Sequence, residues 1–159
     1  MERCRIRGAA EGEQRELTRL CVRATRRAGY DDAFIERAMP ALTISLPLIS
    51  EGFVQLAEHP SGAIAGVVVV TSTALQGIAL LHSLFVDPPF WRRGVGRMLF
   101  QAAVVRMRAL KCGALMIYAE PSAEGFYRRM GALRIGEGPF VFSPDVTLPH
   151  FLYIGQRET

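Results

Sequence analysis

The sequence predicts a single α/β domain of the α+β kind, in which a mixed, mostly antiparallel twisted sheet is flanked by helices. Three observations predict this fold. Residues 53–57, 64–73 and 78–86 are strand-like runs in direct succession, as in an antiparallel sheet. An amphipathic segment over residues 95–111 predicts a helix, and the apolar run 114–119 predicts the next strand. Strand, helix and strand form a right-handed βαβ crossover, so one strand pair is parallel.

Length and composition are those of one compact domain over residues 1–159, because 50% of the residues are hydrophobic and can bury a core. The net charge of +4 is mild. The densest basic run, Arg92, Arg93 and Arg97, lies among glycines rather than in a stripe with aromatic residues. This pattern excludes nucleic acid as the expected partner and favours a small phosphorylated ligand.

The amino-terminal third is predicted to be mainly helical. Residues 4–8 can form a short strand, and residues 12–27 have helical apolar spacing that ends near Gly29. A second helix, over residues 31–39, can be capped by its first aspartate and is followed by a proline. Residues 45–47 offer a further helix start.

The central hairpin and the strand after it are bounded by turn residues. Residues 59–62 separate the first two strand-like runs and have the composition of a tight turn. The third run begins after Gly77 and is stopped by residues 87–89, which include two prolines that cannot donate to a sheet. The three strands are therefore expected to pair antiparallel in order.

The helix over residues 95–111 has the clearest pattern. Its expected buried face consists of apolar residues at helical spacing: Val95, Met98, Leu99, Ala102, Val105 and Ala109. Its expected exposed face consists of Arg97, Gln101, Arg108 and Lys111. Gly113 ends the helix, and the uninterrupted apolar character of residues 114–119 predicts a strand covered on both faces.

The carboxy-terminal part is predicted to contain a short helix and a final hairpin. Ser122 can cap a helix that runs through Met130 and ends at Gly131. Residues 132–135 and 151–154 are strand-like. The glycine- and proline-rich stretch between them is expected to be a loop.

Residues 86–96 take the chain from a strand end into a helix start, where backbone N–H groups have no partner within the helix. A pyrophosphate could bind there, because the helix dipole favours anions and Gly94 and Gly96 permit close backbone approach. Arg92, Arg93 and Arg97 can add charge-assisted contacts. The alternative is a glycine-containing turn before an ordinary surface helix.

Two common nucleotide-binding motifs do not fit. The dinucleotide motif G-x-G-x-x-G requires a third glycine where Leu99 stands, and it belongs on the first strand–helix turn, whereas here several strands precede it. The P-loop motif is absent, and the only lysine, Lys111, is far from the turn.

Residues 84–100, LFVDPPFWRRGVGRMLF, closely resemble motif A of the GNAT acetyltransferases, and residues 123–132, AEGFYRRMGA, resemble the family's second signature. The resemblance spans about residues 78–136. Trp91 departs from the family pattern, which prefers Gln or Arg, and Ser122 stands where many relatives have an asparagine.

The resemblance implies the GNAT fold, with splayed central strands, and acetyl-coenzyme A (acetyl-CoA) as co-substrate, with no metal. The strand ending at residues 84–86 would splay from the strand at residues 115–119, and pantetheine would bind in the gap through backbone groups. The implied cofactor-binding residues are Leu84, Phe85, Val86, Arg92, Arg93, Gly94, Val95, Gly96, Arg97 and Ser122.

Two residues are candidates for proton transfer. Tyr127 matches the tyrosine that faces the coenzyme sulfur in many GNAT enzymes and could act as general acid; the alternative is a packing residue. His82 stands where relatives often carry a glutamate, and a pKa near 6.5 would suit a base. A buried strand histidine is the alternative, with Glu51, Glu120 or water as the base.

The acceptor is expected to bind to the less diagnostic amino-terminal part. There a carboxylate could hold a cation, although the favoured interpretation is that these are solvated surface acids; the residues concerned are Tyr30, Asp31, Asp32 and Glu51. His59 and His150 are interpreted as loop residues.

The function expected from these residues is direct acetyl transfer from acetyl-CoA to a primary amine in a ternary complex, because no cysteine stands out as a nucleophile. A small-molecule acceptor is favoured over a protein. A catalytically silent acyl-CoA-binding module and a protein or peptide N-acetyltransferase are the alternatives. Exposed apolar edge positions would allow a homodimer.

The remaining sequence features concern the compartment. The cysteines Cys4, Cys21 and Cys112 are odd in number and widely spaced, which predicts neither disulfides nor a zinc site. No stretch approaches the roughly 20 apolar residues that span a bilayer, so no membrane association is expected. A reducing cytoplasm is the expected location.

Overall fold

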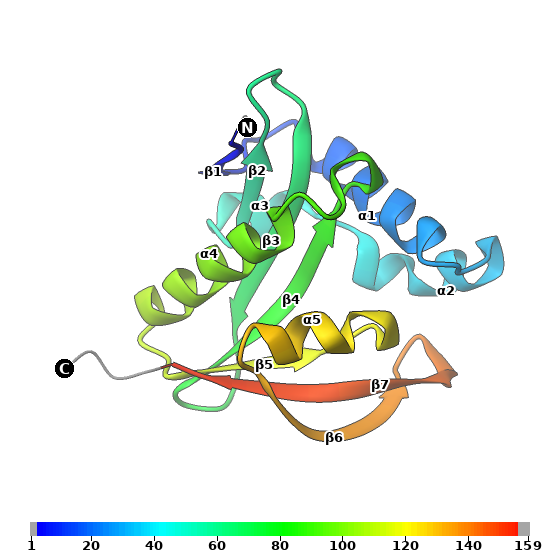
Figure 1. Ribbon diagram of the computed structural model, residues 1–159, viewed down its shortest axis with the longest axis vertical. Helices are drawn as coiled ribbons and strands as arrows, with labels where there is room; N and C mark the ends of the chain where they lie inside the picture. Colours follow the sequence, from blue (N-terminus) through cyan, green and yellow to red (C-terminus); the bar gives the residue numbers. More distant parts are fainter. Residues whose placement is uncertain (1–2, 156–159) are drawn as a thin grey trace.

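The computed structural model describes residues 3–155, which form one seven-stranded sheet with helices on both faces (Figure 1). The strands are β1 (Arg5–Gly8), β2 (Val54–Glu58), β3 (Ile64–Ser72), β4 (Ile78–Val86), β5 (Ala114–Tyr118), β6 (Leu133–Phe140) and β7 (Ser143–Ile154). The helices are α1 (Gln14–Arg27), α2 (Asp32–Leu42), α3 (Leu46–Ser50), α4 (Val95–Ala109) and α5 (Glu124–Arg129), with 3₁₀ turns η1 (Pro88–Phe90) and η2 (Pro121–Ala123).

The strand order is β1-β2-β3-β4-β5-β7-β6, and β4–β5 is the parallel pair among otherwise antiparallel neighbours. Helix α4 makes the crossover between β4 and β5. The predicted mixed sheet with one βαβ unit is therefore confirmed. The succession of β2, β3 and β4 as antiparallel neighbours is confirmed as well.

Alternate residues of the long strand β3 belong to two different hydrophobic cores. Val68 and Val70 pack with α4 in the first, whereas Val67 and Val69 pack with the amino-terminal helices in the second. This follows from the two-residue period of a strand, which points successive side chains to opposite faces. Figure 1 shows α4 and α5 on the near face of the sheet.

The parallel pair is short, and its strands then diverge. Pairing runs from Ile78 opposite Ala114 to Leu81 opposite Ile117, and the residues beyond these have no partner across the β4–β5 gap. On its other side β4 stays paired with β3 as far as Val86. Figure 1 shows β4 turning away from β5. The splay implied by the family resemblance is present in the structure.

A bulge in β4 lies where this divergence begins. Val70 pairs with Leu81 and Val69 pairs with Ser83, so His82 has no direct partner on β3. A bulge adds one residue to a strand and bends it. The bend carries the last residues of β4 away from β5.

Two helix predictions need correction. The face of α4 that is buried consists of Val95, Leu99, Phe100, Ala103, Val104 and Met107. Val105 is 65% exposed, since α4 is rotated to fill the space between β3 and the aromatic residues after β5. Helix α2 continues past Pro40 to Leu42, so Pro40 lies inside the helix and does not end it.

The carboxy-terminal predictions need three corrections. The side chain that caps the turn at residues 121–123 belongs to Glu120, not Ser122, and α5 begins at Glu124. The predicted loop between the last two strands is instead a long hairpin of β6 and β7, whose strand pairing continues through its glycines and prolines. One face of β5 is open, with Tyr118 52% exposed, because no helix covers that end of the sheet.

Candidate active site

A cleft of about 1230 Å³ passes along the diverging strands. Its walls come from the end of α1, from α2, β4, the turn before α4, the end of β5, α5 and the β6–β7 hairpin. Most residues predicted for the site line it: His82, Leu84, Phe85, Val86, Arg92, Gly94, Val95, Gly96, Arg97, Ser122 and Tyr127. The fold thus brings the predicted cofactor-binding turn and the two candidate proton-transfer residues into one cleft.

Arg93 is the predicted site residue that is absent from the described cleft wall. Its guanidinium lies 5.7 Å from the centre of the Phe90 ring. Arg92 and Gly94 on either side of it have φ of 63° and 80°, and both line the cleft. The role predicted for Arg93 in binding the cofactor stays a prediction.

The start of α4 faces the cleft with backbone donors. Gly94 is the N-cap residue in the left-handed region, and the N–H groups of Val95, Gly96 and Arg97 lie in the first turn, where no helix carbonyl can accept from them. A left-handed φ is costly for a residue with a Cβ, yet Arg92 adopts it. Strained backbone of this kind is typical of a ligand-binding turn.

An ion pair holds this turn against α1. Arg23 donates from Nε and Nη2 to the two carboxylate oxygens of Asp87, at 3.0 Å each. The Asp87 side chain is 13% exposed, and its backbone N–H donates to the Ala65 carbonyl at 2.8 Å. The residue that follows β4 is thereby fixed to both a helix and a strand.

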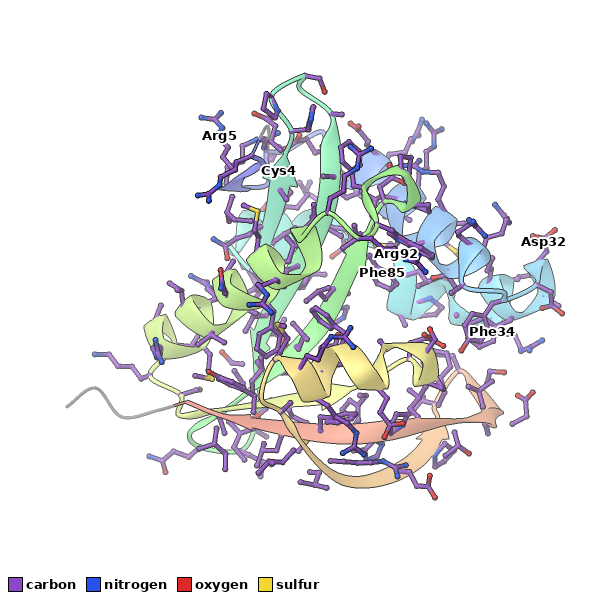
Figure 2. The ribbon with its side chains drawn as sticks, viewed as in Figure 1. Cys4, Arg5, Asp32, Phe34, Phe85 and Arg92 are labelled. Carbon is purple, nitrogen blue, oxygen red and sulfur yellow. The ribbon has the colours of Figure 1, made fainter. Side chains whose placement is uncertain are left out.

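Trp91 also anchors the turn. Its indole N–H donates to the Val86 carbonyl at 2.8 Å, and the Arg27 guanidinium lies 5.9 Å from its ring centre. Trp91, where the resembled family prefers a polar residue, therefore closes the turn back onto the end of β4. In Figure 2, Phe85 and Arg92 lie where β4 runs into this turn.

Tyr127 lies on α5 at the inner wall of the cleft and is 6% exposed. Its ring packs against Phe100, Phe126 and Phe151, with centre distances of 6.2, 5.1 and 6.0 Å. Burial, with a smaller effect from Glu120, raises the pKa of Tyr127 above its ordinary value. The phenol therefore stays protonated at neutral pH and can donate a proton.

His82 lines the cleft at the β4 bulge, with Nδ1 2.8 Å from Ser83 Oγ. Burial lowers the pKa of His82 below 6.5, so its imidazole is neutral at neutral pH. A neutral imidazole can accept a proton. His82 and Tyr127 thus line one cleft in protonation states suited to a base and an acid.

Glu120 follows β5 and joins two parts of the cleft wall. The Tyr30 hydroxyl donates to Glu120 Oε1 at 2.7 Å, and the Ser122 N–H donates to Oε2 at 3.0 Å. The Ser122 hydroxyl also bonds to Oε2. Burial, followed by the hydrogen bond to Glu120, raises the pKa of Tyr30. Both polar groups of Ser122 therefore bond to the Glu120 carboxylate.

The four residues predicted for the acceptor side separate into two groups. Tyr30 lines the cleft. Asp31 caps α2 by accepting from the Phe34 N–H at 2.8 Å, and Asp32 pairs with Arg26 at 2.9 Å. These two acids and Glu51 are absent from the described cleft wall.

His150 was predicted to be a loop residue and is instead a strand residue of β7 that lines the cleft. It sits opposite Tyr118 of β5, and the two rings meet edge to face with centres 4.6 Å apart. A Cβ on Gly138 would lie 2.9 Å from His150 Cε1, so glycine leaves room for this ring. Residues 148–152, Leu-Pro-His-Phe-Leu, do not alternate in polarity, so no local pattern marks His150 as a strand residue.

Within residues 3–155 no three His, Cys, Asp or Glu side chains are grouped so that they could hold a metal ion. No helix in that range has the length and apolar character needed to cross a membrane. The cysteines Cys4, Cys21 and Cys112 are free thiols.

A family model described as the acetyltransferase (GNAT) family matches residues 15–132. The chain belongs to the GNAT acetyltransferase family. The match covers most of the chain and includes α1, the diverging strands and α5. A search of curated proteins found no match.

Solved GNAT structures share this fold. A GCN5-related N-acetyltransferase from Rhodopseudomonas palustris is 15% identical over 97% of each chain, with a TM-score of 0.78. A GNAT acetyltransferase from Brucella melitensis, solved in complex with acetyl-CoA, is 16% identical over 100% of this chain and 92% of that one, with a TM-score of 0.63. Nourseothricin acetyltransferase is 24% identical with a TM-score of 0.60, and the match covers 65% of each chain.

Proposed function

We propose that the protein transfers an acetyl group from acetyl-CoA to a primary amine, without a covalent enzyme intermediate. The observation that carries this proposal is the continuous cleft, which runs from the backbone donors at the start of α4 to Tyr127 and His82. A cofactor bound along it would have its phosphates at one end and its thioester beside these two residues. The B. melitensis relative was solved with acetyl-CoA, which supports the choice of ligand.

Each part of the cofactor has matching groups in the cleft wall. The N–H groups of Val95, Gly96 and Arg97, with the side chains of Arg92 and Arg97, would hold the pyrophosphate. The backbone of residues 84–86 bonds to β3 on one side only, since β5 has diverged. Its open side would bind the pantetheine amides as an added strand would.

Acetyl-CoA supplies an activated acyl group as a thioester. His82 would take the proton from the amine, since its imidazole is neutral at neutral pH. A bond then forms between the amine nitrogen and the acetyl carbon while the carbon–sulfur bond breaks. Tyr127 would give its proton to the departing sulfur, because its raised pKa keeps that proton available.

A small acceptor is favoured over a protein because the acceptor end of the cleft is bridged. Arg37 of α2 donates from Nε and Nη2 to Ser143 Oγ of the hairpin, at 3.3 and 3.2 Å. Ser143 is fully buried, and its hydroxyl donates to Asp145 at 2.6 Å. A flexible protein segment would have to pass this bridge.

The proposal is tested by incubating the protein with acetyl-CoA and panels of small amines and amino-terminal peptides, and measuring thiol release and acceptor mass. The expected result is release of coenzyme A with addition of one acetyl group to a small amine. Tight binding of acetyl-CoA without turnover on any acceptor would favour a silent binding module. Turnover on peptides alone would favour a protein N-acetyltransferase.

We also propose a cytoplasmic location, which suits the three free thiols and the use of acetyl-CoA. Leu133, Ile135 and Ile154 on β6 and β7 are exposed apolar side chains. A homodimer, which the sequence allows, could bury them. Sedimentation of the purified protein over a range of concentrations would test the dimer.

A further inference from the structure

The acceptor end of the cleft is rich in aromatic rings. Tyr30 stacks on Phe34 with ring centres 4.3 Å apart, and Phe34 meets Phe140 at 5.8 Å. Phe140 in turn meets Phe142 at 5.6 Å. All four residues line the cleft, and they form one row from α2 to the hairpin; they are called the aromatic row below.

Apart from His150, the rest of this end is apolar as well. The apolar residues that α2 adds to the wall are Ala38, Pro40, Ala41 and Leu42, and those that the hairpin adds are Gly138, Pro139, Val141 and Leu148. Val141 is 79% exposed and Phe142 is 39% exposed, so apolar surface remains open to a ligand. In Figure 2, Phe34 lies on α2 at this end of the cleft.

The Arg and Glu residues of the described cleft wall lie outside α2 and the hairpin. Glu120 is the only acidic residue among the described residues that line the cleft, and the basic ones are Arg92, Arg97 and Arg129. Arg92 and Arg97 belong to the α4 turn, and Arg129 belongs to α5. Neither α2 nor the hairpin adds a cationic residue to the wall.

Glu120 is tied directly to the aromatic row. It accepts the hydrogen bond of Tyr30, the first member of the row, at 2.7 Å. After burial, the negative charge of Glu120 is the second cause that raises the pKa of Tyr127, the candidate acid. The cleft wall therefore contains a carboxylate that is bonded to its aromatic end.

These observations restrict the acceptor. An amino acid or other anionic amine would need a cation in the wall at the acceptor end, and neither α2 nor the hairpin adds one to the described wall. Arg37 of α2 lies outside that wall and donates instead to Ser143 of the hairpin. A polyamine or aminoglycoside would need several carboxylates, and the described wall has one. A single ammonium on an apolar body matches one carboxylate beside a row of rings, because aromatic side chains bury large apolar area.

We infer that the acceptor is a primary monoamine carried on an aromatic or bulky apolar body, an arylalkylamine in chemical class. This inference rests on the proposed function and names the substrate class of the same site. The aromatic row binds the apolar body, and Glu120 holds the ammonium until it loses its proton. Phe142 and Glu120 are therefore residues that determine specificity.

The test measures binding by calorimetry to the protein with coenzyme A bound, so that it does not depend on turnover. The probes are 2-phenylethylamine, its neutral analogue 2-phenylethanol, spermidine, L-glutamate and a short peptide that begins with phenylalanine. We expect 2-phenylethylamine to bind at least about tenfold more tightly than spermidine, glutamate or the peptide.

Two variants separate the aromatic row from the carboxylate. Phe142→Ala should weaken both 2-phenylethylamine and 2-phenylethanol about fivefold, by removing ring contacts. Glu120→Gln should weaken the amine and leave the alcohol unchanged, because only the amine is charged. Leu75→Ala is the control, since Leu75 is also an exposed apolar residue, 61% exposed, but lies outside the described cleft wall.

Four results would overturn the inference. They are tighter binding of spermidine or glutamate, tighter binding of the peptide, no binding of 2-phenylethylamine to a protein that holds coenzyme A, and unchanged binding in Phe142→Ala. The proposed function fails in a different way, since it requires that acetyl-CoA itself bind. Coenzyme A titrated alone therefore distinguishes the two failures.

Discussion

Tyr127 and His82 are both shielded from water, and burial shifts the pKa of each side chain. The pKa of the tyrosine is raised and that of the histidine is lowered. In each case burial favours the neutral form, because a charged group loses its hydration in the interior. A neutral phenol can give a proton and a neutral imidazole can take one. Burial therefore puts both residues in the protonation states that their proposed roles require.

Tyr127→Phe is expected to lower kcat about a hundredfold, the range for loss of a general acid. The ring contacts with Phe100, Phe126 and Phe151 would remain, so the thermal midpoint and the affinity for acetyl-CoA should not change. Steady-state thiol release and thermal unfolding check this. A variant with wild-type kcat would show that Tyr127 only packs.

The lowered pKa of His82 makes a prediction for pH dependence. kcat should fall as the pH drops through the folded-state pKa, below 6.5, because protonated imidazole cannot accept a proton. The unfolded state binds this proton more readily, so stability should be fully present above pH 6.5 and decline below it. His82→Gln should remove the acid limb of the kcat profile and reduce the loss of stability just below pH 6.5. An acid limb that persists unchanged would assign the base to another group.

Sequence reasoning found the residues that lie inside the two motifs and missed those that become neighbours only on folding. Tyr127 and Gly94 were found because local signatures carry them. The contact between Tyr30 and Glu120 joins residues 90 positions apart, and no local pattern shows it. His150 was missed because the prolines and glycines around it obscured the strand.

Helix α4 packs closely against strand β3 at Gly66. A Cβ on Gly66 would lie 2.7 Å from Leu99 Cδ1 and 2.8 Å from the Phe85 carbonyl oxygen. Gly66 pairs with Val86, the last residue of β4. Helix α4 thus packs directly on β3 beside the end of β4, which lines the cleft.

Gly66→Ala is expected to destabilise the fold by about 1–3 kcal/mol, as overpacking does in a well-packed core. Gly8→Ala is the matched control, because Gly8 is also in a strand and a Cβ there would meet nothing within 4 Å. Chemical unfolding of the two variants checks the difference. Equal stability would show that α4 moves away without cost.

At this scale the sequence predicted most elements but not how they are oriented or joined. β4 was placed from Ile78 to Val86 because turn residues bound it on both sides. The buried face of α4 was partly wrong, since apolar residues surround much of this helix and only contact with the sheet decides which are covered. The β6–β7 pairing depends on cross-strand partners and not on local strand propensity.

The whole molecule is a sheet with two cores, one on each face, and a cleft where the sheet divides. The cores meet along β3, whose alternate residues belong to different clusters. Because β4 leaves β5 after Leu81, the cleft has walls from both halves of the chain. The family match, over residues 15–132, spans both halves as well.

The central claim is that the cleft binds acetyl-CoA with its phosphates at the start of α4. The most direct test is a calorimetric titration of acetyl-CoA into the wild type, Arg97→Glu and Arg108→Glu. Both arginines are exposed on α4, but Arg97 lines the cleft in the first turn whereas Arg108 lies in the last turn, outside the described wall.

We expect micromolar binding by the wild type, a loss of at least about tenfold in Arg97→Glu and no change in Arg108→Glu. That result would place the phosphates at the helix start and support the assignment of the cleft. An absence of binding by the wild type, or an equal loss in the two variants, would contradict it.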